Sequence, residues 1–136
     1  MTDKLVPVSE VLGRILLAAL FIPAGFSKIS GYEGTQGYME AMGVPGMLLP
    51  LVILFEIGGG LLLIAGYQTR LIAAALAGFC VVSGFIFHFQ PADQIQMILF
   101  MKNIAIAGGF LLLVAHGAGD YSLDVKLKHR KFPLQA

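Results

Sequence analysis

Four apolar blocks, each long enough to cross a lipid bilayer as a helix, constrain this chain more than any other feature. A helix of about 20 residues crosses the roughly 30 Å hydrocarbon core of a membrane. Residues 61–64 and 73–77 are apolar on every side, whereas a helix of a soluble bundle keeps a polar face. Arg14 interrupts the first block and Glu10 precedes it, which favours an uncleaved span over a signal peptide. The predicted spans cover approximately residues 11–27, 47–67, 70–89 and 97–116.

The composition excludes several classes of protein. Apolar residues make up 57% of the 136 residues and charged residues 12%, about half the usual charged share. The chain therefore has too few polar residues for a disordered chain or an ordinary soluble enzyme. A net charge of +1 gives no basis for binding nucleic acid. Cys80 is the only cysteine, so the chain has no disulfide and no cysteine redox pair. No cluster of histidine, cysteine or acidic residues has metal-ligand spacing, and no metal site is predicted.

The expected fold is an all-α integral membrane four-helix bundle, formed by one domain over residues 1–136 and running antiparallel, up-down-up-down. Little more than Gln68 and Thr69 joins the second and third spans. The connection between the first two spans, residues 28–46, is long enough for a short helix over residues 35–42. Thr35 would cap that helix, which we expect to lie at the outer membrane interface.

The basic residues predict the orientation. If the amino terminus is cytoplasmic, the outer half of the protein has only Lys28 and Lys102, which satisfies the positive-inside rule. Both termini are therefore expected in the cytoplasm, and the basic tail over residues 120–136 is either solvated or a short helix on anionic lipid. The inner cations are then Lys4, Arg14, Arg70, Lys126, Lys128, Arg130 and Lys131.

Polar residues inside the spans are the candidate functional residues, because ionisable groups in hydrocarbon are costly and normally face the bundle interior. In each span they share a stripe with small residues at three- and four-residue steps, and we expect the four stripes to face one another. The stripes contain Arg14, Ala18, Phe21, Gly25 and Lys28; Ile53, Glu56, Gly60, Leu63 and Tyr67; Arg70, Ala74, Ala77, Val81, Gly84 and His88; and Lys102, Ala105, Gly109, Leu112 and His116.

Depth along the helices predicts which of these residues meet. Glu56 lies about 14 Å and Lys102 about 8 Å below the outer end at 1.5 Å per residue, so a lysine side chain could join them. Arg14 could reach the same carboxylate from the cytoplasmic side. Two interpretations stay open: an ion network that only fixes helix register, or a polar site for a head group or a proton. Asn103 is expected mainly to hydrogen-bond between helices.

The histidines do not form a haem site. His88 and His116 are expected at opposite ends of the bundle, so one haem cannot take both as axial ligands. His129 lies in the tail. We interpret His88 as an interfacial polar residue and keep it as a ligand candidate.

An ordered set of motifs over about residues 11–123 resembles the DoxX family, and within it the YqjF-like branch of bacterial inner-membrane proteins. The set comprises Arg14; Phe26-x-Lys28-Ile29-x-Gly31; Tyr38-Met39-x-x-Met42-Gly43-Val44-Pro45; Glu56-x-Gly58-Gly59; Gly66 with Thr69-Arg70; His88; and Met101-Lys102-Asn103 followed by Gly108-Gly109-Phe110. The resemblance implies a multi-pass protein of the bacterial inner membrane with four helices. Members of the family are described as oxidoreductases, one of them as a subunit of a thiosulfate:quinone oxidoreductase, and others are linked to oxidative or quinone stress.

Two classes of function follow from the residues and the resemblance together. In the first, the protein is a membrane oxidoreductase component that binds a quinone or a similar small molecule between its helices, together with a soluble or membrane redox partner. Arg14, Lys102 and Asn103 would bind the quinone oxygens, and Glu56 would be the catalytic residue that exchanges a proton. In the second, the protein is an assembly subunit of a membrane complex, or a small transporter, without chemistry of its own. A homo-oligomer is compatible with either. Structural roles are expected for Lys28, Arg70, Gly43 and Pro45.

Overall fold

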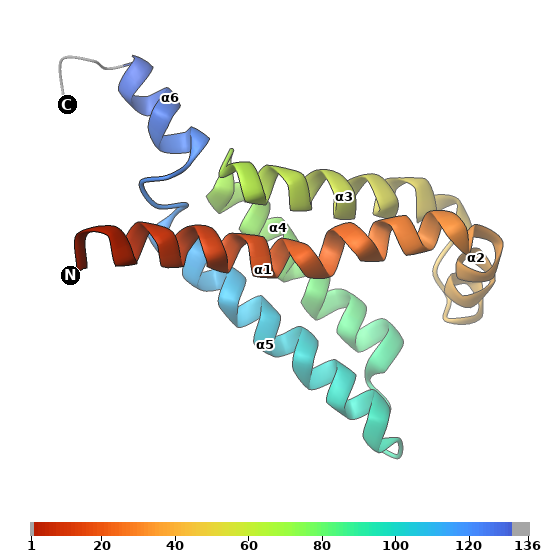
Figure 1. Cartoon of the computed structure of the whole chain (residues 1–136). Helices are drawn as coiled ribbons and strands as arrows, with labels where there is room; N and C mark the ends of the chain where they lie inside the picture. The colour runs from red at the N-terminus through yellow and green to blue at the C-terminus, as the bar shows by residue number, and fades with distance from the viewer. Residues whose placement is uncertain (1, 132–136) are drawn as a thin grey trace.

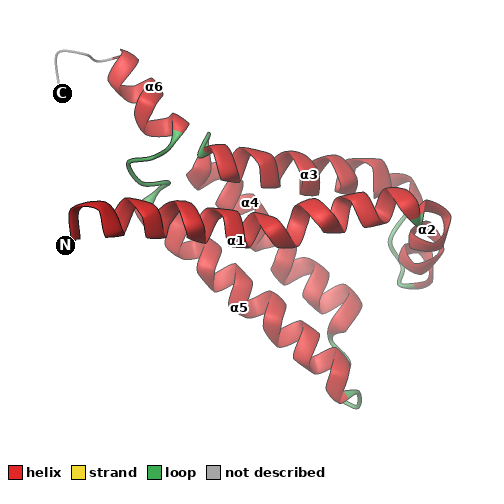
Figure 2. Cartoon of the chain, viewed as in Figure 1, coloured by secondary structure: helices red, strands yellow, loops and turns green. Residues whose placement is uncertain are grey.

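The computed structural model describes the backbone of residues 2–131 and the side chains of residues 3–128, and the regular structure in this range is entirely helical (Figure 2). Residues 132–136 of the predicted tail lie outside the described residues. The elements are α1 (Thr2–Ser30), α2 (Tyr32–Ala41), the 3₁₀ turn η1 (Gly46–Leu48), α3 (Leu49–Ala65), α4 (Thr69–Ser83), the π-helical turn η2 (Gly84–His88), α5 (Gln94–His116) and α6 (Leu123–Lys131).

Four of these segments are long and apolar enough to cross a membrane, which confirms the predicted number of spans. They are Asp3–Ser30, Gly46–Ala65, Thr69–His88 and Gln94–His116. The first span is longer than the sequence predicted, because α1 already begins at Thr2. The short helix α2 is also present, but Thr35 does not cap it. Thr35 lies inside the helix, where its hydroxyl donates a hydrogen bond to the Gly31 carbonyl at 2.9 Å.

The bundle consists of two antiparallel helix pairs, α1 with α3 and α4 with α5 (Figure 1). Glycines allow the first pair to pack closely, as small residues do at helix interfaces in membranes. A Cβ atom on Gly25 would lie 2.5 Å from Ile57 Cγ1, and one on Gly60 would lie 2.6 Å from Ile22 Cγ1. Neither position can accept a larger side chain without moving a helix.

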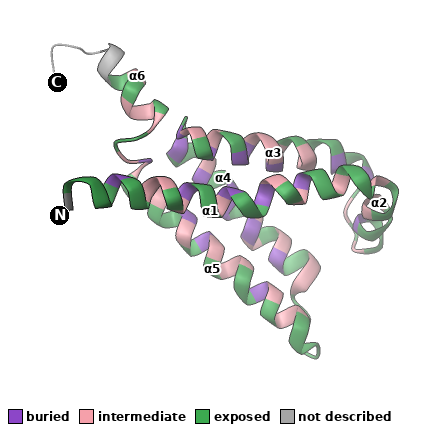
Figure 3. Cartoon of the chain, viewed as in Figure 1, coloured by how far each residue is buried: buried purple, intermediate pink, exposed green. Residues whose placement is uncertain are grey.

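The two pairs lie close together at one end of the bundle and diverge towards the other (Figure 1). We call the closed end, where α1 begins and α6 lies, the α6 end, and the open end, where α2 lies, the α2 end. Buried residues follow the facing sides of the helices (Figure 3). Their shared apolar core includes Ala18, Phe21, Leu63, Leu76, Ala107 and Phe110. The divergence leaves the facing surfaces less completely covered at the α2 end.

The stripes predicted for α1 and α3 are largely confirmed, because Arg14, Ala18 and Glu56 are buried. Tyr67, the last residue of the α3 stripe, is exposed. The stripe predicted for α4 is only partly right, since Ala77 and Gly84 are buried but Arg70 is exposed.

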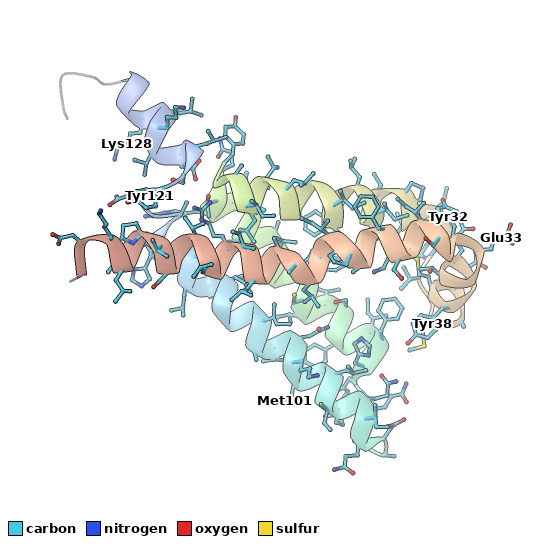
Figure 4. All side chains as sticks on the ribbon, viewed as in Figure 1. Tyr32, Glu33, Tyr38, Met101, Tyr121 and Lys128 are labelled. Carbon is cyan, nitrogen blue, oxygen red and sulfur yellow. The ribbon has the colours of Figure 1, made fainter. Side chains whose placement is uncertain are left out.

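For α5 the predicted stripe is wrong. Lys102, Ala105, Leu112 and His116 are exposed, and the buried face carries Phe100, Ala107 and Phe110 instead. Met101, beside Lys102, also points away from the other helix pair (Figure 4). Successive helical residues are about 100° apart. A stripe drawn through Lys102 instead of Asn103 therefore predicts the wrong inward face for α5.

Candidate functional site

A cavity of about 430 Å³ lies between the two helix pairs at the α2 end. We call it the interpair cavity. Residues of α1, α2, α3, α4 and η2 line it, together with Asn103 of α5. Its volume lies within the range of cavities that hold small organic molecules. Of the five residues that the sequence marked for ligand binding, the cavity brings together Glu56, His88 and Asn103, and it leaves out Arg14 and Lys102. Lys28, for which only a structural role was predicted, also lines the cavity.

An ion pair between α1 and α3 forms one wall of the cavity. Lys28 Nζ donates hydrogen bonds to both carboxylate oxygens of Glu56, at 2.9 and 3.1 Å. The Glu56 side chain is 3% exposed and that of Lys28 29%. The predicted pair between Glu56 and Lys102 is therefore wrong. It fails because α3 packs along α1, whereas α5 packs along α4 and turns Lys102 outward.

The opposite wall carries polar groups from α4, η2 and α5. Ser83 donates to the Cys80 carbonyl at 3.4 Å, and Nδ1 of His88 bonds to Oε1 of Gln96 at 2.9 Å. The side chain of Asn103 packs against Gly84, and its amide bonds to no other side chain within residues 3–128. A π-helical turn is uncommon and often occurs at functional sites. Here η2 brings Phe87 and His88 to the cavity.

Helix α2 covers the cavity at the end of the bundle. Tyr38 points from α2 towards the α4–α5 pair (Figure 4), where its ring stacks on Phe87 with the centroids 5.3 Å apart. Gln36 donates to the Gly46 carbonyl at 3.1 Å and so holds α2 against η1. Gly43 has a φ of 84°, in the left-handed region that glycine favours, and with Pro45 it turns the chain from α2 into η1. The structural roles predicted for these two loop residues agree with this geometry.

Along the sides of the helices, the rim of the cavity is apolar and exposed. Leu20 is 47% exposed, Val82 57% and Ile86 37%. In a bilayer, side chains at these positions contact lipid. The cavity therefore has an apolar, exposed opening along the sides of the helices and is covered by α2 at the end of the bundle.

Arg14 lies at the α6 end and contacts backbone instead of the cavity. Its guanidinium donates to the carbonyls of Leu63 at 3.2 Å and Ile64 at 2.8 Å, and to the carbonyl of Tyr121. The side chain is completely buried. These contacts are structural, and the expectation that Arg14 reaches the carboxylate of Glu56 is wrong.

Three features of the site were missed in the sequence. Lys28 was expected to have only a structural role, although it ends the stripe of Gly25 beside Glu56 and pairs with that carboxylate. The cover formed by Tyr38 and the support of His88 by Gln96 depend on contacts between separate helices, which helical spacing does not reveal. Cys80 is buried in the cavity wall, and mid-span cysteines carry no pattern that predicts this.

Known proteins resemble this chain over most of its length. It is 52% identical over 95% of its residues to the inner membrane protein YqjF of Escherichia coli, of which the match covers 98%. It is 35% identical over 87% of its residues to the inner membrane protein YphA of the same bacterium, covering 89% of that chain. A third relative, named "Putative oxidoreductase CatD" in Bacillus subtilis, is 28% identical over 77% of this chain and 81% of its own. No solved structure matches the chain significantly.

The family model described as DoxX matches residues 10–89. This range contains most of α1 and all of α2, α3, α4 and η2, and with them every cavity residue except Asn103. The inner-membrane relatives and the four apolar helices agree with a multi-pass protein of the inner membrane. The chain is a member of the DoxX family.

Proposed function

We propose that this protein is a membrane oxidoreductase component that binds a quinone, or a similar lipophilic molecule with polar oxygens, in the interpair cavity. The observation that carries the proposal is a cavity with an exposed apolar rim that contains both an ion pair and an amide without a hydrogen-bond partner among residues 3–128. A molecule that dissolves in the bilayer can reach such a site directly. A water-soluble molecule would have to displace α2.

The polar groups of the two walls match the oxygens of such a ligand. A lysine ammonium has three N–H donors, and Lys28 uses two of them on Glu56, so one remains for a ligand oxygen. On the opposite wall, the Asn103 amide offers a second donor. Glu56 is the candidate for proton exchange, because its carboxylate is buried beside the same oxygen position. Quinones supply two-electron redox chemistry when bound, and a soluble or membrane redox partner would take or give the electrons.

The relative named as an oxidoreductase supports this class of function for the family. The alternatives are an assembly subunit without chemistry and a small transporter. An assembly subunit does not account for an unpartnered amide that faces a cavity of this volume, whereas a bound ligand does. A transported molecule would account for it equally, so only the name of the oxidoreductase relative favours the redox component over the transporter.

The orientation of the protein remains part of the proposal, with both termini in the cytoplasm. The two described chain ends lie at the α6 end of the bundle (Figure 1), so one measurement decides on which side of the membrane both of them lie. We expect an impermeant thiol reagent to label Gly34→Cys in intact cells and to leave Lys128→Cys unlabelled, each in a Cys80→Ala background. Labelling of Lys128→Cys alone would reverse the orientation.

The functional test compares two lysines on the purified protein in lipid nanodiscs. Lys28→Met removes the donor in the cavity, and Lys102→Met removes a cation of the exposed face. Loss of one charge-assisted hydrogen bond costs about 1.5–3 kcal/mol, or roughly 10- to 150-fold in affinity. We expect Lys28→Met to weaken binding of a short-chain benzoquinone by this factor and Lys102→Met to leave it unchanged.

Two results would contradict the proposal. If the wild-type protein binds no quinone, with or without a co-purifying partner, the redox function is wrong and the assembly subunit becomes the better interpretation. If Lys102→Met weakens binding and Lys28→Met does not, the ligand binds elsewhere.

A further inference from the structure

Within the described residues, His88 is the cavity residue whose side chain hydrogen-bonds to a side chain outside the cavity. Its Nδ1 lies 2.9 Å from Oε1 of Gln96, and Gln96 is not part of the cavity lining. The backbone of Gln96 is anchored in the first turn of α5, where its N–H donates to the Asp93 side chain at 3.2 Å. The ring of His88 thus has its Nδ1 edge against α5, and the same residue lines the cavity.

The partner of Nδ1 determines what the other nitrogen can do. A carboxamide oxygen only accepts hydrogen bonds, so Nδ1 carries the proton that joins it to Gln96. In a neutral imidazole the other nitrogen is then an acceptor. Nε2 bonds to no side chain or backbone group within the described part of the chain. The cavity thus has a hydrogen-bond acceptor at His88, whereas Lys28 and Asn103 supply donors.

We propose that the ligand of the interpair cavity carries a hydroxyl group that donates a hydrogen bond to Nε2 of His88, and that Gln96 is the positioning residue that keeps Nε2 an acceptor. This inference rests on the proposed function and makes its substrate class more specific. A quinone has only acceptor oxygens, whereas a hydroquinone or another phenol has a donor. The reduced or phenolic form is therefore the one that satisfies both walls, with an oxygen accepting from Lys28 and a hydroxyl donating to His88.

The test uses two probes that differ only in this hydroxyl, 4-dodecyloxyphenol and its methyl ether. Their affinities are measured for the protein in nanodiscs at pH 8, where an ordinary imidazole is neutral. A buried acceptor left unpaired costs about tenfold or more in affinity. We expect the wild-type protein to bind the phenol about tenfold more tightly than the ether, and His88→Leu to lose this preference.

Two variants of Gln96 separate positioning from simple packing. In Gln96→Glu the side chain still accepts from Nδ1, so the preference for the phenol should remain. In Gln96→Lys the ammonium donates to Nδ1 and moves the imidazole proton to Nε2, so the two probes should bind within about twofold of each other. Nitrogen-15 spectra of the His88 ring give the independent readout. We expect protonated Nδ1 in the wild type and protonated Nε2 in Gln96→Lys.

The outcomes distinguish this inference from the function on which it rests. Equal binding of the two probes by the wild type, or a wild-type ring protonated on Nε2, overturns the inference and leaves the cavity as a quinone site. If neither probe nor the benzoquinone binds, both the proposed function and this inference are wrong.

Discussion

The two ends of the bundle use the same kinds of polar residue for different purposes. At the α6 end, the guanidinium of Arg14 bonds to three backbone carbonyls. The carboxylate of Asp124 accepts from the backbone N–H groups of Gln68 and Thr69 at 2.7 and 2.9 Å. Both side chains thus bond to backbone. At the α2 end, Lys28 keeps a donor free beside a cavity.

The difference shows that burial of a polar group in a membrane bundle does not by itself indicate a binding site. Backbone groups at helix ends need partners, and Arg14 and Asp124 supply them where α3 ends and α4 begins. The surroundings of Arg14 are closely packed, because a Cβ on Gly66 would lie 2.5 Å from Arg14 Nη1 and from Ser122 Cβ. The α2 end has both unpartnered groups and free volume, which is the combination that a ligand requires.

Removing the arginine should have the largest effect on stability. Arg14→Met leaves the carbonyls of Leu63, Ile64 and Tyr121 without their donor, and each unsatisfied buried group costs about 1–3 kcal/mol. We expect the free energy of unfolding to fall by about 3 kcal/mol or more, and the midpoint of thermal unfolding in detergent to fall by roughly 10 °C. The matched control is Arg70→Met, an exposed arginine at the same end, which should change the midpoint little. Equal melting of the two variants would show that the α6 end is not held by Arg14.

The ion pair at the α2 end should be less important for stability than for binding. Glu56→Ala leaves Lys28 without an acceptor, whereas Glu56→Gln keeps an oxygen at the same position. We expect Glu56→Ala to lower the free energy of unfolding by about 1–3 kcal/mol and Glu56→Gln to lower it less, because Lys28 is partly exposed and can be hydrated.

The double variant Glu56→Ala with Lys28→Met should recover much of that loss, since no unpaired charge remains. It should not recover ligand binding. If Glu56→Ala unfolds like the wild type and also binds ligand normally, the ion pair contributes to neither, and the contrast between the two ends is wrong.

The smallest expected effect concerns the tail. Asp124→Ala removes the acceptor for the first N–H groups of α4, and the loss of such a cap costs about 1 kcal/mol. Asp120→Ala is the matched control, because Asp120 is exposed in the same segment. A thermal midpoint lowered only by Asp124→Ala would confirm that the tail holds the α6 end. Identical midpoints would assign that role to Arg14 alone.

The sequence predicted the features that depend on length and spacing. Four spans, the short helix α2 and the buried stripes of α1 and α3 follow from apolar runs and three- and four-residue steps. The face of α5 did not, because Lys102 and Asn103 are neighbours and either could have faced inward. The neutral amide faces inward, and the charged residue faces out.

Contacts of side chains with the backbone could not be predicted from the sequence. Arg14 bonds to a carbonyl 107 positions along the chain, and a carbonyl is present at every residue. Nothing in the sequence separates Tyr121 from its neighbours as that partner. The cavity itself arises from the angle between two helix pairs, which no local pattern encodes.

A methionine methyl NMR titration tests the central claim, that the interpair cavity binds a lipophilic quinone-type molecule. Met39 is buried in the cavity wall, whereas Met101 is 58% exposed on the outer face of α5. With methyl-labelled methionine and assignment by Met39→Leu and Met101→Leu, a short-chain benzoquinone is titrated into the protein in nanodiscs. We predict a saturable shift of the Met39 signal, an unchanged Met101 signal, and loss of the Met39 shift in Lys28→Met. A Met39 signal that does not move, or a Met101 signal that moves equally, would contradict the central claim.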